Sequence, residues 1–305
     1  MGSPNVLAIG TFDGVHLGHR AILDRLGQIA QERGGRRVVY AFAHPPRFTT
    51  RPDHSAGLLL PLDVRIDLLR RTADHLVLAS FADVRELAPR AFAEQVLADE
   101  LCVSTVVVGV GFRFGQGRTA DVATLQRLGE DLGFDVVGVP HVLVEDRPVS
   151  STRIRSLLRA GRVLEAGRLL GRPPVLIGRV AAGDRIGRSL GHPTANLALD
   201  PEVLLPGDGI YFARAIVDGQ RAHGLLYIGR RPTFGTDTRR CELHLLANPQ
   251  TDLYDLWIEV HVMERMRDDR PFESPDELRA QIDRDVRAAT DLARRHSLTF
   301  DSIRG

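Results

Sequence analysis

Lysine is absent from this sequence, and cysteine is nearly so. Because arginine and histidine are the only basic side chains, the chain offers neither a Walker lysine nor a lysine Schiff base. Any bound phosphate must therefore be held by backbone amides, arginine, histidine or a metal ion. The two cysteines, Cys102 and Cys241, lie far apart, which suits a reducing compartment and excludes a zinc site built on cysteine.

Long apolar runs and a strong net charge are also missing. No apolar run reaches the roughly 18 residues of a membrane span, and no charged-then-apolar leader precedes the first predicted strand. The net charge is +1, so no overall field attracts nucleic acid or an anionic membrane. We expect a cytoplasmic protein that binds neither nucleic acid nor membranes; the oligomeric state stays open.

The chain is long enough for two domains, with 305 residues and 43% hydrophobic content. In its first half, short apolar runs alternate with helix-like stretches. The runs are VLAIG, RVVYAFA, HLVLASFA, TVVVGVG and DVVGVP, and the stretches include RAILDRLGQIAQERG and RAFAEQVLADEL. This alternation predicts βα units and a parallel sheet.

After Gly171 the pattern changes to strands separated by turn residues. These strands are GRVAAG, IYFARAIVDG, RAHGLLYIG, CELHLLA and LWIEVHVME, and they fit a compact antiparallel barrel. A terminal helix follows, where Ser274 fits the N-cap, Pro275 the first helical position and Glu277 the capping box. The hinge is predicted near GRPP, which gives domains 1–171 and 172–305.

Two histidines, His16 and His19, lie in TFDGVHLGHRAIL, at the predicted junction between a strand and a helix. The free amides and positive dipole end of a helix N-terminus suit phosphate, and Gly14 and Gly18 permit close backbone approach. The histidines would then donate hydrogen bonds as charge moves onto a leaving pyrophosphate. For an isolated HxxH, a turn and helix-cap pair is the commoner explanation, and a zinc site lacks a third ligand at a typical spacing.

A second motif, PVSSTRIRSLL, supplies hydroxyls and amides at another predicted helix start. Ser150, Ser151 and Thr152 offer the hydroxyls, while Arg153 and Arg155 supply positive charge. Alone, this motif would be an ordinary N-cap with surface arginines. Together with FDGVHLGH it resembles the paired signatures of the nucleotidylyltransferase superfamily, whose members join a phosphate or acid to the α-phosphate of a nucleotide.

The second half has a specific motif of its own, PTAN, after a glycine-rich stretch that hairpin turns explain as well as a phosphate loop does. Thr194 and Asn196 are small oxygen donors that can complete a magnesium shell shared with nucleotide phosphates. Glu242 lies on a predicted strand. It is either the base that takes a proton from a substrate hydroxyl or an unremarkable strand glutamate.

Nine motifs cover nearly the whole chain in order: GTFDGVHLGH, GFRFGQGR, VSSTRIR, LLGRP, GRSLGHPTAN, IGRRPTF, ELHLL, DLY and QIDRDV. In that order they resemble the bacterial bifunctional riboflavin kinase/FMN adenylyltransferase family, also called FAD synthetase. The resemblance implies an α/β nucleotidylyltransferase domain with a Rossmann-like parallel sheet, then a small antiparallel β-barrel riboflavin kinase domain with a C-terminal helix. It implies that riboflavin and ATP give FMN and ADP, and that FMN and ATP then give FAD and pyrophosphate, both with Mg²⁺.

The resemblance also assigns roles to individual residues. His16 and His19 would be catalytic in the adenylyltransferase, and Glu242 would be the catalytic base of the kinase. ATP in the adenylyltransferase would contact Gly10, Phe12, Asp13, Gly14, His16, Gly18, His19, Ser151, Thr152 and Arg155. Mg-ATP in the kinase would contact Gly183, Arg188, Thr194 and Asn196, the last two as Mg²⁺ ligands. The flavin of the first domain would contact Phe112, Arg113 and Phe114.

Five positions depart from the family's usual pattern. Gly111 stands where Asp usually precedes FRFG, His192 where Phe precedes PTAN, and Tyr227 where Asn precedes IGRRPTF. Ala247 replaces Asp after ELHLL, and Asp255 replaces Gly after DLY. Two alternatives stay open: a kinase alone, with the first domain impaired by Gly111, and a flavin-binding sensor or carrier without catalysis, which the retained HLGH, SSTR and PTAN motifs argue against.

Overall fold

The chain forms two compact units. The computed structural model describes residues 3–44, 57–181, 192–230, 239–247, 253–297 and 300–304. One unit consists of Met1–Ala56 and Leu62–Ser151, and the other of Gly57–Pro61 and Thr152–Gly305. The domain boundary at residue 171 stays a prediction, and the predicted contacts Gly183 and Arg188 lie outside the described residues.

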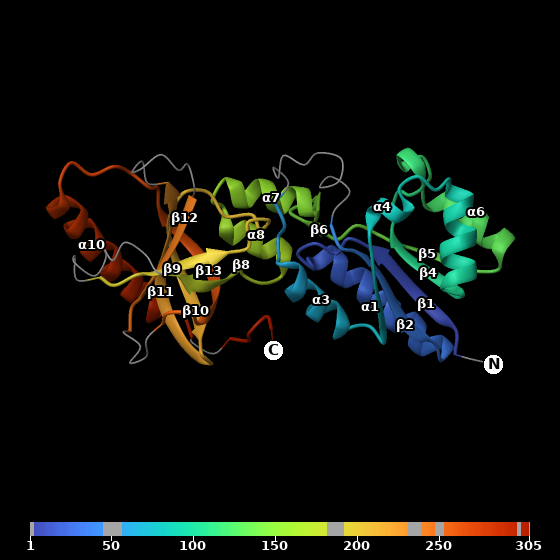
Figure 1. Cartoon of the computed structure of the whole chain (residues 1–305), viewed down its shortest axis with the longest axis horizontal. Helices are drawn as coiled ribbons and strands as arrows, with labels where there is room; N and C mark the ends of the chain where they lie inside the picture. Colours follow the sequence, from blue (N-terminus) through green and yellow to red (C-terminus); the bar gives the residue numbers. More distant parts are fainter. Residues whose placement is uncertain are drawn as a thin grey trace. The chain divides into compact units, whose positions relative to one another are not determined.

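The first unit is built on a five-stranded parallel sheet (Figure 1). Its strands are β1 (Asn5–Gly10), β2 (Arg36–Phe42), β3 (His75–Ala79), β4 (Val103–Gly109) and β5 (Asp135–Val139). They lie in the order β3-β2-β1-β4-β5, and every neighbouring pair is parallel. All five apolar runs of the first half form strands, so the predicted parallel sheet is confirmed.

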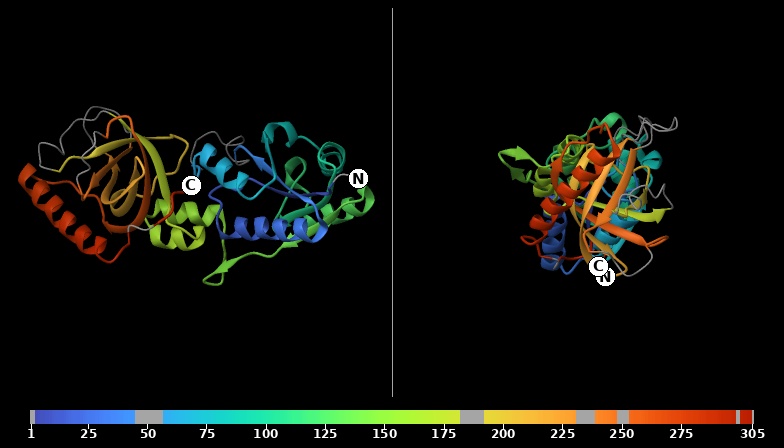
Figure 2. Two further views of the ribbon diagram at one scale, coloured as in Figure 1. Left: turned by 90° about the horizontal axis from the view of Figure 1, so that it is seen from below. Right: turned by 90° about the vertical axis from the view of Figure 1, so that its left-hand side faces the viewer.

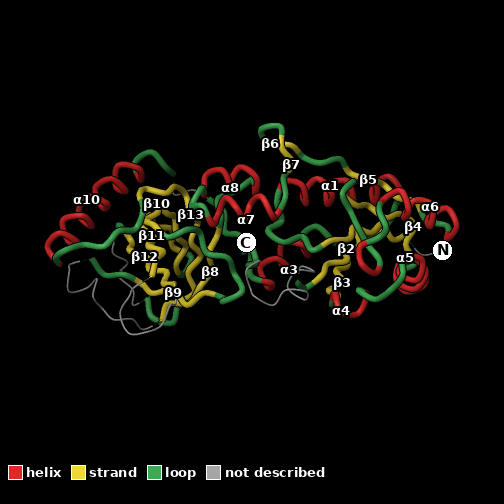
Figure 3. The backbone as a smooth tube through the Cα atoms, turned by 90° about the horizontal axis from the view of Figure 1, so that it is seen from above, coloured by secondary structure: helices red, strands yellow, loops and turns green. Residues whose placement is uncertain are grey.

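Both faces of this sheet are covered by helices, which explains why its strands are apolar at nearly every position. Along β1, Val6 and Ala8 pack with residues of α1 (Leu17–Arg33) and α3 (Leu62–Arg70). Their neighbours Leu7 and Ile9 pack with residues of the π-helix η1 (Phe92–Glu100) and of α6 (Val122–Leu132). Figure 3 traces these helices around the strands. The shorter elements of the unit are α4 (Phe81–Val84), α5 (Pro89–Ala91), η2 (Gln116–Arg118), β6 (Leu143–Val144) and β7 (Arg147–Pro148).

The second unit contains a closed barrel of six antiparallel strands, as predicted. Its strands are β8 (Val175–Ala181), β9 (Ala195–Leu199), β10 (Gly209–Val217), β11 (Gln220–Arg230), β12 (Arg239–Leu245) and β13 (Trp257–Arg267). They close in the order β10-β11-β12-β9-β8-β13. Among the described strands of the barrel, β9 is the one that the sequence pattern does not predict.

Three helices accompany the barrel: α7 (Ser151–Arg159), α8 (Val163–Leu170) and α10 (Pro275–Ala293). The predicted start of α10 is confirmed, since Ser274 Oγ accepts a hydrogen bond from the Glu277 backbone N–H at 3.2 Å and Pro275 is the first helical residue. The Glu277 carboxylate accepts the Glu273 N–H at 3.0 Å, one residue before the N-cap that a capping box usually bonds. This bond and Arg270 lower the pKa of Glu277.

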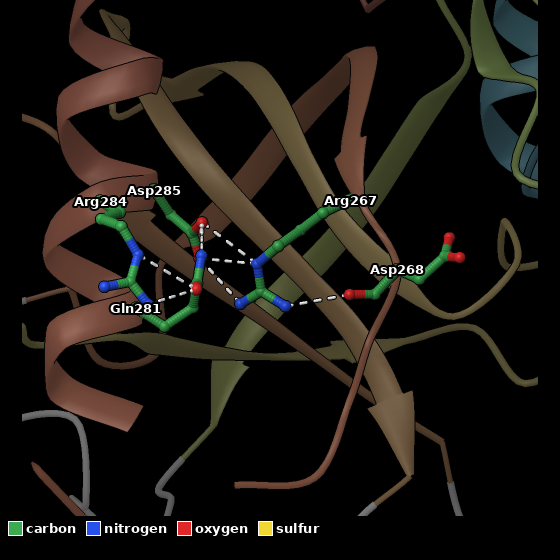
Figure 4. A network of polar contacts seen from close by, with 5 residues as sticks. All are labelled: Arg267, Asp268, Gln281, Arg284 and Asp285. Carbon is green, nitrogen blue, oxygen red and sulfur yellow. Dashed lines mark hydrogen bonds and ion pairs between the residues drawn. The ribbon is translucent and has the colours of Figure 1, made fainter. Parts of the chain in front are cut away.

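Helix α10 lies along the barrel, as Figure 2 shows. Its Ala289 packs with Phe212 of β10 and Leu225 of β11, which closes an apolar cluster over the strands. A polar network also holds α10 against the barrel (Figure 4). The Arg267 guanidinium at the end of β13 donates to both oxygens of the buried Asp285 carboxylate, from Nε to Oδ1 at 3.1 Å and from Nη2 to Oδ2 at 2.8 Å, and Gln281 donates to the same carboxylate at 2.8 Å. Bidentate pairs of this kind fix orientation as well as distance.

Candidate active sites

The first site lies where the strand order of the parallel sheet changes direction. β1 is central, and it pairs with β2 on one side and β4 on the other. In such sheets ligands bind beyond the carboxyl ends of the strands that flank this switch point. The turn with the two histidines follows β1, and the predicted flavin contacts follow β4. Both predicted sets of the first domain therefore begin at neighbouring strand ends.

The turn after β1 has an unusual backbone. Gly14 adopts φ 82°, but Phe12 and Val15 also have positive φ, at 52° and 39°. Such values are costly for residues with a Cβ, and they persist only where surrounding contacts enforce them. Here the Phe12 side chain is 1% exposed, and Val15 N–H donates to Phe12 O at 3.0 Å. A Cβ at Gly10 would contact the Phe12 ring at 3.4 Å, so the strand end and the turn pack closely.

His16 is the N-cap of α1. Its Nδ1 accepts a hydrogen bond from the His19 backbone N–H at 3.3 Å. Because Nδ1 is used as an acceptor, the neutral imidazole carries its proton on Nε2. The helix-cap explanation of the histidine pair is thus confirmed for His16.

The two imidazole rings stack. Their centroids are 3.6 Å apart with an interplanar angle of 15°, and the Phe12 ring meets His19 edge-on at 5.4 Å. Gly18 makes the stack possible, because a Cβ there would lie 3.2 Å from His16 Cε1. The pair is therefore held by contacts on several sides, as preorganised hydrogen-bond donors need to be.

The SSTR motif reaches the same turn through its second serine. Ser151 Oγ donates to Asp13 O at 3.1 Å, which ties the start of α7 to the buried residue Asp13 in the middle of the turn. Thr152 and Arg155 follow on α7, where Arg155 Nε donates to Gly57 O at 2.8 Å. The structure thus brings Ser151 to Asp13 and places Arg155 against Gly57.

Arg65 is a residue of this region that the motifs do not reveal. It lies on α3 and is fully buried, and its guanidinium donates to Thr11 O at 3.0 Å and to Ala43 O. Burial lowers the pKa of Arg65, and the nearby Asp13 carboxylate opposes that shift. The signal in the sequence is its spacing: Arg65 stands four residues before the buried Leu69 and so shares the apolar face of the helix.

The predicted flavin contacts have structural partners of their own. Phe114 is 6% exposed in the core, and its ring stacks with that of Phe112 at 5.7 Å. Arg113 pairs with Asp121 at 3.1 Å. A Cβ at Gly111 would lie 3.2 Å from the exposed ring of His141, so His141 would have to give way slightly to the Asp that is usual in the family. Contact with flavin stays a prediction for these residues.

The second site is formed by two neighbouring barrel strands. β9 and β12 pair so that Asn196 lies opposite Glu242. Thr194, just before β9, donates its hydroxyl to Glu242 Oε2 at 3.4 Å. Glu242 is only 6% exposed. The three predicted residues of the kinase, a hydroxyl, an amide and a carboxylate, are therefore brought together by one strand pairing.

Two neighbours of Glu242 on β12 are held in defined states. His244 Nδ1 lies 2.9 Å from Pro193 O, and burial lowers the pKa of His244, so Nδ1 carries the proton that this bond needs. Burial raises the pKa of the Cys241 thiol to about 12, which leaves it unreactive at neutral pH. His244 thus ties the PTAN motif to β12, two residues beyond Glu242.

Two of the departures from the family pattern acquire a physical context. Tyr227 of β11 lies directly opposite Glu242, and its hydroxyl donates to Asp269 at 3.1 Å, so this substitution adjoins the proposed base. Asp255 adopts φ 65°, a value that glycine takes freely and that Asp tolerates better than most residues. Ala247 is exposed beyond the end of β12.

Comparison with known proteins identifies one family match in the first half of the chain and another in the second. The FAD synthetase family matches residues 2–153, and the riboflavin kinase family matches residues 170–293. A bifunctional riboflavin kinase/FMN adenylyltransferase of Pseudomonas fluorescens is 37% identical over 94% of this chain and 93% of the relative. The protein of that description from Escherichia coli K12 is 35% identical over 94% of this chain and 92% of the relative.

A solved structure shares the whole fold. The crystal structure of a macrolide-efflux protein from Streptococcus pneumoniae superposes with a TM-score of 0.86 and 29% identity, over 97% of this chain and 96% of that one. Its name refers to efflux, whereas the family matches and the two relatives point to flavin synthesis; in the described part of our chain, no helix combines the length and apolar character of a membrane span. On the strength of the matches in both halves, the chain belongs to the bifunctional riboflavin kinase/FMN adenylyltransferase family.

Proposed function

We propose that the barrel unit phosphorylates riboflavin with ATP through Glu242, Thr194 and Asn196, and that the parallel-sheet unit adenylylates the resulting FMN through His16 and His19. The first reaction gives FMN and ADP, and the second gives FAD and pyrophosphate. Both are displacements at phosphorus that need no nucleophile from the enzyme, so catalysis comes from positioning and charge stabilisation. The observation that carries the proposal is the convergence of Thr194, Asn196 and Glu242 in a unit that matches riboflavin kinase.

In the kinase reaction, the primary hydroxyl of riboflavin attacks the γ-phosphorus of ATP, and the bond from that phosphorus to the bridging oxygen of ADP breaks. The hydroxyl is a poor nucleophile until its proton has an acceptor. Glu242 fits this role because it is a buried carboxylate on β12, and the hydroxyl of Thr194 lies 3.4 Å from its Oε2. The proton passes from the hydroxyl to the Glu242 carboxylate.

In the adenylylation, a phosphate oxygen of FMN attacks the α-phosphorus of ATP, and the bond to the pyrophosphate oxygen breaks. Negative charge grows on the leaving pyrophosphate. We infer that His16 and His19, whose rings stack at the N-terminus of α1, donate hydrogen bonds to it. Ser151 supports the turn through Asp13, and Arg65 supports it through Thr11.

Mg²⁺ fits the donor set of the kinase site. Thr194, Asn196 and Glu242 offer hydroxyl, amide and carboxylate oxygens, and Mg²⁺ prefers such hard ligands while it keeps several of its waters. Thr194 and Asn196 would hold the ion. When bound, Mg²⁺ would neutralise charge on the ATP phosphates.

The decisive experiment incubates purified protein with riboflavin, ATP and Mg²⁺ and separates riboflavin, FMN and FAD by chromatography. The proposal expects FMN to appear first and FAD to follow. Formation of FMN without FAD would indicate a protein with riboflavin kinase activity only. The match of residues 2–153 to FAD synthetase does not favour this alternative. Bound flavin with no turnover would indicate a sensor or carrier and would overturn the proposal.

We also propose that these reactions take place in the cytoplasm. The support is that Cys102 and Cys241 are both free thiols, as a reducing compartment permits. Fractionation of the producing cells, with the two activities as markers, tests this location.

A further inference from the structure

The departure at His192 has a partner on the terminal helix. His192 Nε2 lies 2.8 Å from Asp283 Oδ1, and the His192 side chain is 18% exposed. Where the family commonly has Phe, this chain has a residue that can donate a hydrogen bond, and it meets an acceptor on α10. The contact joins the segment before β9 to a helix about ninety residues later in the chain.

This contact is made two residues before Thr194. Pro193, the intervening residue, is itself bonded through its carbonyl oxygen to His244 Nδ1 at 2.9 Å. The His192 ring meets the His244 ring edge-on at 5.3 Å. The approach to Thr194 is thus held from two sides, by α10 through His192 and by β12 through His244.

Helix α10 is a firm base for such a contact. The buried bidentate pair of Asp285 with Arg267 fixes the helix on the end of β13, and the apolar cluster with Phe212 fixes it on the barrel (Figure 4). Asp283 lies two residues before Asp285 on α10, and its side chain is nearly half exposed. It is therefore held by a rigid element while its carboxylate is free to serve a second segment.

We propose that His192 and Asp283 form a positioning pair, which holds the PTAN motif so that Thr194 meets Mg-ATP in register with Glu242. The proposal rests on the kinase function proposed above. Nε2 donates to Asp283 in the charged imidazole and in one neutral tautomer, so the pair needs no change of protonation.

The test measures steady-state kinetics of the full-length protein in both reactions, with Mg-ATP varied. We expect His192→Phe and Asp283→Ala, each of which removes one partner of the bond, to raise the KM for Mg-ATP in riboflavin phosphorylation by about three- to tenfold, with kcat changed less. The double variant should be no worse than either single variant, because the two residues act through one bond. The KM for Mg-ATP in FMN adenylylation should stay at its wild-type value.

Matched variants separate positioning from stability. His192→Gln places an amide N–H close to the position of Nε2 and should restore most of the wild-type KM, whereas His192→Asn is too short to do so. Asp291→Asn, which removes a surface pair with Arg294 on the same helix, should change neither reaction. If His192→Phe melts at a lower temperature, the KM values of His192→Gln and His192→Asn distinguish a positioning role from a general loss of stability.

Several results would contradict the positioning role of His192 and Asp283. These are an unchanged KM in both single variants, additive effects in the double variant, equal KM values for Gln and Asn at position 192, or an equal loss in Asp291→Asn. Failure of the wild-type protein to form FMN would instead overturn the kinase function itself, so the two failures are distinguishable.

Discussion

The two candidate active sites are ordered by different means. In the parallel-sheet unit, the histidines lie in a turn with positive φ at Phe12 and Val15, and His16 is also the N-cap of α1. In the barrel unit, the pairing of β9 with β12 sets Glu242 opposite Asn196, and the backbone ladder does not depend on either side chain. Substitutions in the barrel site should therefore change activity without changing stability. In the turn, some substitutions should change both.

The largest effect tests this separation in the barrel. Glu242→Gln keeps the size of the side chain and removes the proton acceptor, so riboflavin phosphorylation should fall by about two orders of magnitude or more. The melting temperature and FMN adenylylation should remain at wild-type values. Near-normal FMN formation by this variant would remove Glu242 from the role of base.

The next effect concerns His19. If it donates a hydrogen bond that strengthens as pyrophosphate leaves, His19→Ala should lower FAD formation roughly a hundredfold, since one preorganised donor is worth about 3 kcal/mol. Ground-state ATP binding should weaken less, and riboflavin phosphorylation should persist. Normal turnover per folded molecule with a lowered melting temperature would assign His19 to structure alone.

His16→Ala is the matched variant, because it removes the cap as well as a donor. The loss of an N-cap costs about 1 kcal/mol of stability, so this variant should lose FAD formation and also melt at a lower temperature. Thermal melts and both activity assays on one preparation compare the two histidines directly. Equal melting temperatures for the two variants would show that His16 does not stabilise the unit more than His19 does.

The third prediction concerns the part of the chain that the barrel requires for stable folding and activity. Within the second unit, α8 packs against β13, and Gly207 N donates to Leu158 O of α7 at 2.8 Å. Fragments 152–305 and 172–305 should both phosphorylate riboflavin and make no FAD. The shorter one lacks α7 and α8, and burying even one large apolar side chain is worth about 2 kcal/mol, so it should be less stable by at least that amount in urea unfolding. Equal stability would place the working boundary at residue 171.

The sequence predicts most of this fold because its signals are local. Runs such as TVVVGVG need no partner to be recognised, and Ser274, Pro275 and Glu277 specify the start of α10 among themselves. The convergence of Thr194 and Glu242 was implied only by family resemblance, because it depends on the pairing of β9 with β12 across 48 positions of the chain.

What the sequence does not reveal depends on tertiary contacts. The spacing of Arg65 places it on the apolar face of its helix, but its acceptors, Thr11 O and Ala43 O, are brought to it from two strand ends by the fold. His192 differs from the family pattern, but its partner Asp283 is identified only by the fold. Periodicity can indicate that a polar residue is buried, but it does not identify a partner at long range.

The smallest effect tests whether backbone conformation matters in the barrel unit as it does in the turn. Asp255 has φ 65°, where a residue with a Cβ is strained by roughly 1–2 kcal/mol and Asp by less. Glycine relieves that strain but adds about 0.4–1 kcal/mol of entropy to the unfolded chain. The ion pair of Asp255 with Arg179, at 3.5 Å and well exposed, contributes little.

We therefore expect Asp255→Gly to stabilise the barrel by less than about 1 kcal/mol. Asp255→Ala keeps a Cβ and loses the tolerance of Asp for this conformation, so it should destabilise the barrel. Urea unfolding of the two variants beside the wild type checks the order Gly, Asp, Ala; an alanine variant as stable as the glycine variant would show that the backbone at this position is not under strain.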